Sequence, residues 1–353
     1  MLQYMTAKDA AEKWNISQRR VSVLCSENRI LNAAMLGKMW IIPVSAQKPL
    51  DARVQNNKFD NQSIHPFVKW AGGKSQSLET LLKFMPENIS TLKKYAEPMV
   101  GGGALFFKVL SKYKFEKFYI SDINAELINS YKVIKTDVEK LINKLYDLQT
   151  SFLTMNDDDR KDLYYKIRDE FNSTALSDKT AINKAAEFIF LNKTCFNGLY
   201  RVNRKGEFNV PMGAYKNPTI CDKENLRNIS KALKNVEIVC GDYSLSESFI
   251  DKDTFVYLDP PYRPISETSG FTAYTSEVFN DDEQIRLSKF IDEMNKKGAK
   301  FILSNSDPKN VKQEDNFFDD LYNEYRINRV SATRMINSNA EKRGKINELI
   351  ICN

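Results

Sequence analysis

The sequence predicts an α/β fold: a doubly wound, mostly parallel sheet preceded by a small, separate N-terminal module. Two observations carry this prediction. From residue 66 onward, apolar strand-like runs alternate with helical patterns, which is typical of parallel sheets with helices on both faces. Before them, residues 46–66 are polar, rich in Asn and Gln and without periodicity, which indicates a linker between two folded parts.

The first 53 residues predict a winged helix-turn-helix. Thr6, with Asp9 three residues later, is an N-cap pattern that opens one helix, and Ser-Gln-Arg-Arg opens a second. MLGKMWIIP (35–43) then predicts a short hairpin. This order resembles the excisionase-type DNA-binding modules, with Arg19 and Arg20 where a recognition helix begins. The alternative is a dimerisation or packing appendage.

The larger part contains five predicted strands, and each runs into a loop with glycine or polar residues. Residues 131–192 interrupt this series with a dominantly helical stretch. Because the carboxyl ends of parallel strands meet at one edge of a sheet, we expect functional groups to gather there. The predicted strands and their loops lie at 95–100, 117–122, 236–243, 254–262 and 299–307.

The first two strand ends predict a site for a nucleoside without phosphates. Glycines after a strand let the backbone approach a ligand closely, and EPMVGGG supplies three, Gly101 to Gly103. Asp122 ends the next strand and offers a carboxylate to the two hydroxyls of a ribose. The glycine spacing is not GxGxxG, and no phosphate-binding lysine follows it. S-adenosylmethionine is the obvious candidate.

DPPY (259–262) predicts a preorganised site for an exocyclic amine of a base. Pro260 and Pro261 fix the backbone and supply no N–H donors. The Asp259 carboxylate and the Pro260 carbonyl can accept both amino hydrogens, so that the nitrogen lone pair points at an electrophilic methyl. Tyr262 can stack on a base held outside the helix. The alternative is a loop with two stiffening prolines.

Charge and composition indicate the partners. Nine Lys and Arg residues stand against three acids in residues 193–234, which favours a polyanionic ligand, although a solvated basic face is the alternative. No apolar run reaches the roughly 18 residues of a membrane span, so we expect a cytoplasmic protein without a membrane partner. Five scattered cysteines and the single His65 predict neither a zinc site nor disulfides.

Eight motifs in one order resemble the Dam-type, alpha-class (D12) DNA N6-adenine methyltransferases. The resemblance covers about residues 66–352 and leaves the first 55 residues outside it. The motifs are FVKWAGGKSQ, EPMVGGGALFF, SDINAELI, NKTCFNGLYRVNRKGEFNVPMGAYKNP, DPPY, FTAYTSEVF, SNSD and INSNAEKRGKINELI. It implies a Rossmann-like catalytic domain at 66–130 and 236–353, with an inserted target-recognition domain of helices and a β-hairpin at 131–235, beside the module at 1–53 and the linker at 54–65.

The resemblance also implies roles for single residues. Trp70 and Lys74 would close over S-adenosylmethionine, above Gly101 and Gly103, with no metal required. The other implied cofactor contacts are Asp122 at the ribose and Asp242 and Tyr243 at the adenine, while the implied catalytic residues are Asp259, Pro260 and Tyr262.

The resemblance implies that the basic stretch reads duplex DNA, with 5′-GATC-3′ as the site. Arg201 would take a guanine edge, Lys69 the guanine before the target, and Tyr215 would help fill the gap left by the flipped base. Family members usually carry Arg where this chain has Ala214, which leaves the exact site open. The remaining implied DNA contacts are Asn197, Leu199, Pro211, Arg334, Lys342 and Arg343.

Three functions stay open on the sequence. The first is an adenine methyltransferase, either paired with a separate restriction endonuclease or an orphan. The second is a sequence-specific DNA-binding regulator that works through the N-terminal module, with methylation secondary. The third is an enzyme that methylates cytosine N4 or RNA, although enzymes acting on cytosine N4 more often carry Ser in place of Asp259.

Overall fold

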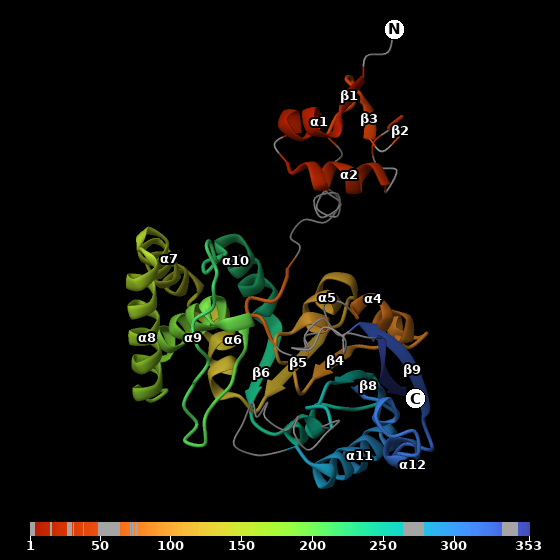
Figure 1. The fold of residues 1–353 in the computed structure, drawn as a ribbon. Helices are drawn as coiled ribbons and strands as arrows, with labels where there is room; N and C mark the ends of the chain where they lie inside the picture. The colour runs from red at the N-terminus through yellow and green to blue at the C-terminus, as the bar shows by residue number, and fades with distance from the viewer. Residues whose placement is uncertain are drawn as a thin grey trace. The chain divides into compact units, whose positions relative to one another are not determined.

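The computed structural model divides the chain into two compact units, Met1–Ser63 and Ile64–Asn353, which are described separately (Figure 1). None of the helices described is long and apolar enough to cross a membrane. The structure describes residues 4–14, 16–26, 30, 32–37, 39–48, 64–70, 72, 74, 77–263, 279–333 and 345–353.

The N-terminal unit packs two helices against a three-stranded antiparallel sheet of order β1-β3-β2. Thr6 and Asp9 form the predicted capping pair, since the Asp9 N–H donates to Thr6 Oγ1 (3.3 Å) and the Thr6 N–H donates to Asp9 Oδ2 (2.9 Å). Both predicted helices and the hairpin are confirmed, and β1 is an additional strand. The elements are β1 Tyr4–Thr6, α1 Ala7–Trp14, α2 Gln18–Ser26, β2 Ala34–Leu36 and β3 Met39–Pro43.

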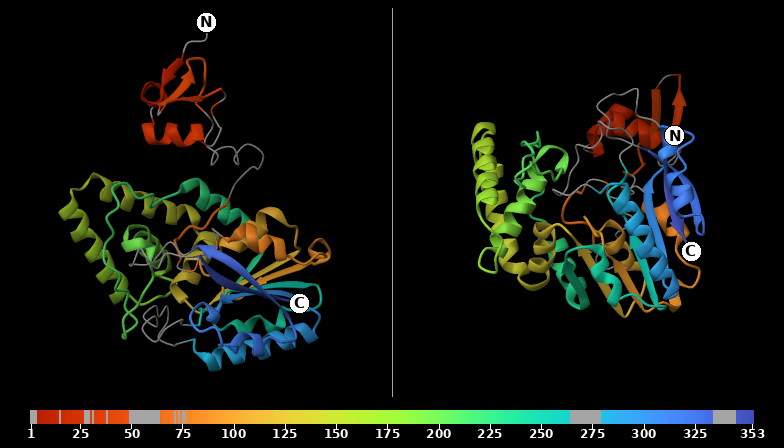
Figure 2. Two further views of the ribbon diagram at one scale, coloured as in Figure 1. Left: turned by 45° about the vertical axis from the view of Figure 1, so that its right-hand side comes forward. Right: turned by 90° about the horizontal axis from the view of Figure 1, so that it is seen from below.

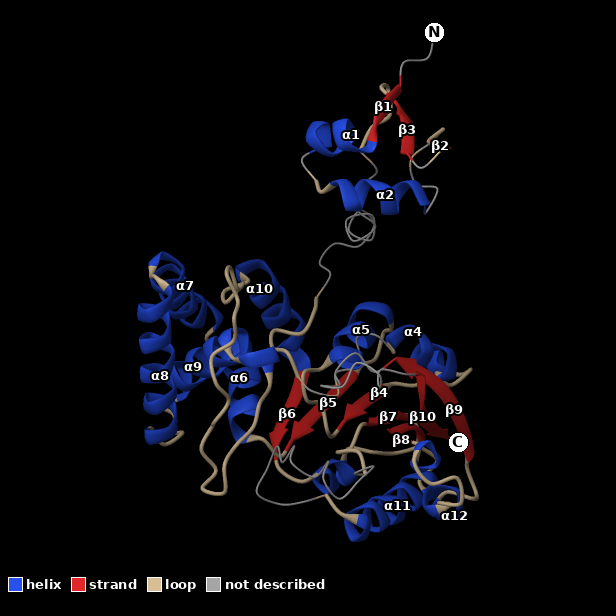
Figure 3. Cartoon of the chain, in the orientation of Figure 1, coloured by secondary structure: helices blue, strands red, loops and turns tan. Residues whose placement is uncertain are grey.

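The second unit is built on a seven-stranded sheet of order β6-β5-β4-β7-β8-β10-β9 (Figure 3). Neighbours from β6 to β8 run parallel, which confirms the predicted mostly parallel sheet. β10 runs antiparallel to both β8 and β9. The strand β8 was predicted, whereas β9 and β10 were not. The strands are β4 Lys94–Glu97, β5 Lys117–Asp122, β6 Val236–Cys240, β7 Thr254–Leu258, β8 Lys300–Ser306, β9 Arg326–Thr333 and β10 Lys345–Cys352.

Helices cover both faces of the sheet, as Figures 1 and 2 show. Side chains alternate along each strand, so that in β7 Phe255 joins one apolar cluster and Val256 joins the other. The first cluster lies under α5 and α6, and the second lies under α11 and α12. These helices, with the short α4, are α4 Leu78–Leu81, α5 Ala104–Lys112, α6 Ala125–Thr136, α11 Asp281–Lys296 and α12 Phe317–Leu321.

A group of helices lies beyond the β6 edge, beside α6 (Figures 1 and 2), and confirms the predicted helical stretch. Its buried aromatics, including Tyr164, Phe188 and Phe190, continue the first apolar cluster. These helices are α7 Val138–Thr154, α8 Asp157–Ser173, α9 Ala181–Thr194 and α10 Lys223–Ala232. Short 3₁₀ helices are η2 Leu82–Phe84, η3 Ile89–Thr91, η4 Phe196–Gly198, η5 Leu233–Asn235, η6 Tyr243–Ser248 and η8 Pro308–Asn310.

The strand order reverses between β4 and β7. From β4 the chain moves outward through β5 to β6, then returns to the other side of β4 as β7 and moves outward again to β8. In such sheets the loops after the two central strands diverge and leave a crevice at their carboxyl ends, where ligands bind. The loops after β4 and β7 are EPMVGGG and DPPY.

Candidate active site

The glycine turn after β4 cannot carry side chains. Gly101 and Gly103 have φ angles of 49° and 71°, in the left-handed region. A Cβ on Gly101 would lie 2.8 Å from Trp70 Cδ1, and one on Gly103 would lie 2.5 Å from the Tyr131 hydroxyl. The turn geometry and the close approach of Trp70 and Tyr131 therefore require glycine at these positions.

Asp122, at the end of β5, ties the next strand to this turn. Its carboxylate accepts the backbone N–H of Gly101 (3.0 Å) and that of Asn124 (2.9 Å). Burial raises the pKa of Asp122, and these backbone donors oppose that shift. A carboxylate has about four lone-pair positions, so this one can still accept hydrogen bonds from a ligand.

Asp242, in the loop after β6, is bound by an arginine for which no sequence pattern predicted a role. Arg286 on α11 donates to Asp242 Oδ1 (3.1 Å) and Oδ2 (2.7 Å), and its guanidinium lies 4.4 Å from the centre of the Tyr243 ring. The hydrogen bonds from Arg286 lower the pKa of Asp242 to about 2. The carboxylate and the ring are thereby fixed together.

Asp259, directly after β7, forms an ion pair with Lys74. The Lys74 ammonium donates to Asp259 Oδ1 (2.7 Å) and Oδ2 (3.0 Å) and to the Gly72 carbonyl (3.1 Å). It also lies 4.6 Å from the centre of the Tyr262 ring. Burial raises the pKa of Asp259, and the positive charge of Lys74 opposes that shift. The two sequence motifs KWAGGK and DPPY thus meet in one site.

Glu97, the last residue of β4, is a further ionisable group here, and it is only 2% exposed. It accepts a hydrogen bond from the Tyr95 hydroxyl. Burial raises the pKa of Glu97 well above its usual range, and the nearby charge of Asp259 adds to the shift. The sequence signal was available, since Glu97 is the acid in EPMVGGG, but no role was predicted for it.

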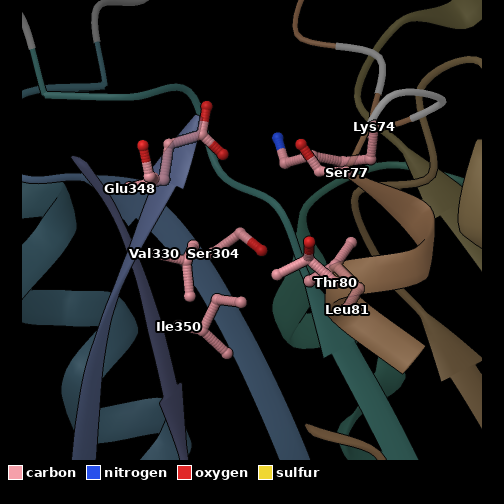
Figure 4. Close-up of a pocket in the computed structure, with 9 residues that line it drawn as sticks. Lys74, Ser77, Thr80, Leu81, Ser304, Val330, Glu348 and Ile350 are labelled. Atoms are coloured by element: carbon pink, nitrogen blue, oxygen red, sulfur yellow. The ribbon is translucent and has the colours of Figure 1, made fainter. Parts of the chain in front are cut away.

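A small pocket opens beside Lys74 between α4 and strands β8, β9 and β10. In Figure 4, Lys74 and Glu348 extend toward each other from opposite walls, with Ser304 below them. The β9–β10 pair, which sequence reasoning missed, therefore supplies a wall next to the Lys74–Asp259 ion pair. The lining residues are Lys74, Ser77, Thr80, Leu81, Ser304, Val330, Ser331, Glu348 and Ile350.

Lys69 and Tyr215, both predicted DNA contacts, touch each other. The Lys69 ammonium donates to the Tyr215 hydroxyl (3.1 Å) and lies 4.2 Å from the centre of its ring. Asn192 fixes the Lys69 backbone by accepting from its N–H (2.8 Å) and donating to its carbonyl (2.8 Å). Gly198 lies against the Lys69 side chain, where a Cβ would approach Lys69 Cδ to 2.4 Å. The structure thus joins KW(69–70) to the recognition segment.

Arg201 and Asn209 face each other across the predicted hairpin. The Arg201 Nε donates to Asn209 Oδ1 (2.8 Å), and the strands touch only at isolated bridges, such as Val202 with Phe208. Pro211 accepts the Phe196 backbone N–H (2.9 Å) at the base of the segment. The predicted pairing around Lys205-Gly206 is present, but it is less regular than two strands. The loop is the long green one in Figure 1.

Phe196 is a residue that sequence reasoning missed. Its side chain is 52% exposed, and it precedes Asn197, whose φ of 55° makes a sharp turn. The same short turn contains Gly198, which lies against the Lys69 side chain, so this exposed aromatic belongs to the segment that Lys69 contacts. Other predicted contacts, Arg334, Lys342 and Arg343, lie outside the described residues, as do 271–278 of FTAYTSEVF.

No group of three or more possible metal ligands occurs within the described ranges.

A family model described as "D12 class N6 adenine-specific DNA methyltransferase" matches residues 70–336. The chain belongs to this family. It is therefore an adenine-specific DNA methyltransferase, and DNA is its substrate. The hypotheses of cytosine N4 or RNA methylation do not agree with this family.

Relatives of the D12 chain align over most of its length. The type II methyltransferase M.MjaIII of Methanocaldococcus jannaschii is 52% identical over 293 residues, which are 82% of this chain and 99% of that protein. The type II methyltransferase M1.LlaDCHI of Lactococcus lactis subsp. cremoris is 37% identical over 302 residues, which are 85% of this chain and 98% of that protein. A DNA adenine methylase of Vibrio cholerae is 33% identical over 285 residues, which are 80% of this chain and 94% of that protein.

The buried Glu97 predicts a measurable pH dependence of stability. Its folded pKa lies above the value of about 4.3 in an unfolded chain, so the folded protein binds the proton more tightly. The free energy of unfolding contributed by this group therefore falls as pH rises above about 4.3, until the folded pKa is passed. We expect Glu97→Gln to remove this loss.

The free energy of unfolding, measured by chemical denaturation between pH 4.5 and 8, checks this prediction for Glu97. The stability of Glu97→Gln relative to the natural protein should rise with pH, with a slope of up to about 1.4 kcal/mol per pH unit. Glu116→Gln, at an exposed position, is the control and should show a flat difference. A flat difference for Glu97→Gln as well would contradict the prediction.

Proposed function

We propose that this enzyme methylates N6 of an adenine that is turned out of duplex DNA, at the carboxyl ends of β4 and β7. The observation that carries the proposal is the geometry of Asp259 to Tyr262. The carboxylate is held by Lys74 at a buried strand end, and the following carbonyl belongs to a buried proline. Two acceptors next to an aromatic ring match the demands of an exocyclic amine.

The side chains of this site have distinct tasks in the proposal. The target amine takes the place of the Lys74 ammonium at one oxygen of the Asp259 carboxylate, while the Pro260 carbonyl accepts the second amino hydrogen. Tyr262 stacks on the base and excludes water from one of its faces. Because the amine loses its proton only after it gains the methyl, no strong base has to act on it first.

S-adenosylmethionine supplies the methyl group when bound, and the residues of the glycine turn fit it. Gly101 and Gly103 permit the left-handed turn that keeps side chains off this stretch of backbone, and Trp70 lies directly against Gly101. Asp122 offers its remaining lone pairs to the ribose hydroxyls, and Asp242 with Tyr243 receives the adenine. Three strand ends therefore contribute one contact region each, as expected at a topological switch point.

The proposed target is 5′-GATC-3′, read by the inserted helical and hairpin part of the chain at 131–235. Arg201 reads a guanine edge, and Asn209 orients its guanidinium before DNA binds. Lys69 reads the guanine before the target. Phe196 and Tyr215 fill the gap that the flipped adenine leaves. Leu199 and Pro211 contact the thymine methyl, Asn197 shapes the turn, and Arg334, Lys342 and Arg343 bind phosphates.

The relatives support a modification role. Two of them are named type II methyltransferases, from Methanocaldococcus jannaschii and Lactococcus lactis subsp. cremoris, and others are named DNA adenine methylases. We infer that this chain protects a site from a separately acting endonuclease, with an orphan methylase as the second candidate. Ala214 keeps the exact sequence of that site open.

The N-terminal unit is proposed to be a winged helix-turn-helix that contacts DNA. Gln18, Arg19 and Arg20 are exposed in succession at the start of α2, where recognition helices meet base edges. Neither arginine side chain forms an ion pair with any residue that the structure describes. The predicted linker at 54–65 joins this unit to the enzyme in one chain, so its DNA binding would raise the local concentration of duplex. A regulator that uses this unit at its own promoter is the second candidate function.

Methyl transfer to matched duplexes tests the proposal for the catalytic unit. Tritiated methyl should enter a GATC duplex and not a GTTC duplex, and Asp259→Ala should lower the rate by at least 10²-fold because the target amine loses an acceptor. Incorporation into genomic DNA but not into GATC would overturn the roles of Lys69 and Arg201. An Asp259→Ala enzyme as active as the natural one would overturn the catalytic assignment.

Removing the two arginines of α2 tests the N-terminal unit. Arg19→Ala/Arg20→Ala should weaken binding to duplex DNA and reduce the slope of log affinity against log salt by about 2, while the methyl-transfer rate at saturating DNA stays unchanged. Lys8→Ala/Lys13→Ala removes the same charge from α1 and is the matched control. Equal losses in both variants, or none in either, would contradict a specific role for α2.

A further inference from the structure

The segment from Asp259 to Arg263 lacks the usual means of holding a backbone in place. Pro260 and Pro261 have no N–H groups, so the parallel ladder of β7 with its neighbours stops at Leu258. The segment adopts neither helix nor strand. Its position therefore depends on side chains that reach it from other elements.

Gln284, in the first turn of α11, supplies one such contact. Its Nε2 donates to the Pro261 carbonyl (3.2 Å), and its Oε1 accepts from Asn305 Nδ2 (3.1 Å). Gln284 is fully buried, at 0% exposure. Its neighbours on the same helix, Leu287 and Ile291, are equally buried but apolar. Burying a glutamine in this apolar layer costs free energy unless both polar atoms of its amide form hydrogen bonds.

Asn305, in β8, supplies the second contact and is also 0% exposed. Its Oδ1 accepts the backbone N–H of Arg263 (3.4 Å) and that of Ser306 (2.9 Å). The Ser306 hydroxyl then donates to the Arg263 carbonyl (3.1 Å). Gln284, Asn305 and Ser306 thus hold the peptide groups on both sides of Tyr262.

We propose that Gln284 and Asn305 are positioning residues for methyl transfer. They form a buried amide pair that fixes the peptide groups at 261 and 263, and this sets where the Tyr262 ring and the Pro260 carbonyl point. None of their hydrogen bonds uses the Pro260 carbonyl, so that acceptor remains available for the target amine. The inference rests on the proposed roles of Asp259, Pro260 and Tyr262.

Arg263 shows that the outer side of the segment is held in a different way. Its guanidinium donates to Asp281 (2.7 and 2.9 Å) and to Asp315 (2.8 Å), and these acids are partly exposed. Such contacts are weakened by salt, whereas the buried amide pair is not. The amide pair also bonds the backbone itself, whereas the ion pairs hold only the end of the Arg263 side chain, so the amide pair should govern geometry at the reacting atoms.

The test compares single-turnover methyl transfer in Gln284→Leu, Asn305→Leu and the double variant, with enzyme in excess over a GATC duplex and saturating S-adenosylmethionine. Each rate is divided by the concentration of enzyme that binds the cofactor, so that a smaller folded fraction in a variant does not lower its apparent rate. Each single variant should lower the rate roughly 10- to 100-fold, since a misplacement of about 1 Å can cost 10²-fold. Dissociation constants for the cofactor and the duplex should change less than about threefold.

The double variant should lose little more than the worse single variant, because both residues act on one segment. Gln284→Glu keeps the acceptor for Asn305 but removes the donor to Pro261, so its rate should also fall. Asn225→Leu is the matched control: Asn225 is 4% exposed and its amide brackets the His65 backbone, away from this segment. It should lower the melting temperature and leave the single-turnover rate unchanged.

The outcomes separate this inference from the proposed function. If Asp259→Ala abolishes transfer while Gln284→Leu and Asn305→Leu retain the natural single-turnover rate, the positioning role is wrong and the catalytic assignment stands. If Asp259→Ala leaves transfer intact, the catalytic assignment itself fails. Strictly additive losses in the double variant would also overturn the amide pair as a unit.

Discussion

A carboxylate at the end of a buried central strand needs a counter-charge, and in this protein Lys74 supplies it to Asp259. Desolvation disfavours the charged form of an isolated acid, so without this ammonium the carboxyl would tend to hold a proton. The ion pair keeps an acceptor at the place where the strand order reverses. It also joins a turn near the start of the unit to a loop 185 residues later.

The neighbouring groups depend on this arrangement in different ways. Glu97 ends the adjacent strand, and its burial and the nearby charge of Asp259 raise its pKa. The glycine turn admits Trp70 at close range, and Asp122 fastens that turn to β5. Behind the prolines, buried amides replace the hydrogen bonds that the ladder can no longer make. Side chains from α11 and β8 therefore hold the loop in place.

Much of this could be predicted from the sequence, because the signals were local. Apolar runs that stop at Gly101, Asp122 and Asp259 gave the strands, their parallel order and the site-bearing loops, and the spacing in residues 131–192 gave the helices. Strand β10 was missed because most of its residues lie in the motif INSNAEKRGKINELI, and β9, which precedes that motif, received no prediction. Glu97 was visible beside the glycines, yet nothing local indicated that its burial would couple it to Asp259.

The remaining contacts could not be predicted because they join residues that are distant in the chain. No periodicity marks Gln284 as the partner of Asn305, or Arg286 as the partner of Asp242, since each pair forms only when α11 packs on the sheet. Phe196 was within a quoted motif, but exposure of an apolar side chain is a property of the folded chain alone. Sequence patterns thus located the loops of the site, whereas the side chains that hydrogen-bond to these loops are determined by how the helices pack on the sheet.

A crystal structure of the enzyme with a GATC duplex and a non-reactive cofactor analogue is the most direct test. We expect an extrahelical adenine that stacks on Tyr262 and whose N6 lies within hydrogen-bond distance of the Asp259 carboxylate and the Pro260 carbonyl. The Lys74 ammonium should be displaced from at least one carboxylate oxygen. An adenine N6 bound elsewhere, with the Lys74–Asp259 ion pair unchanged, would contradict it.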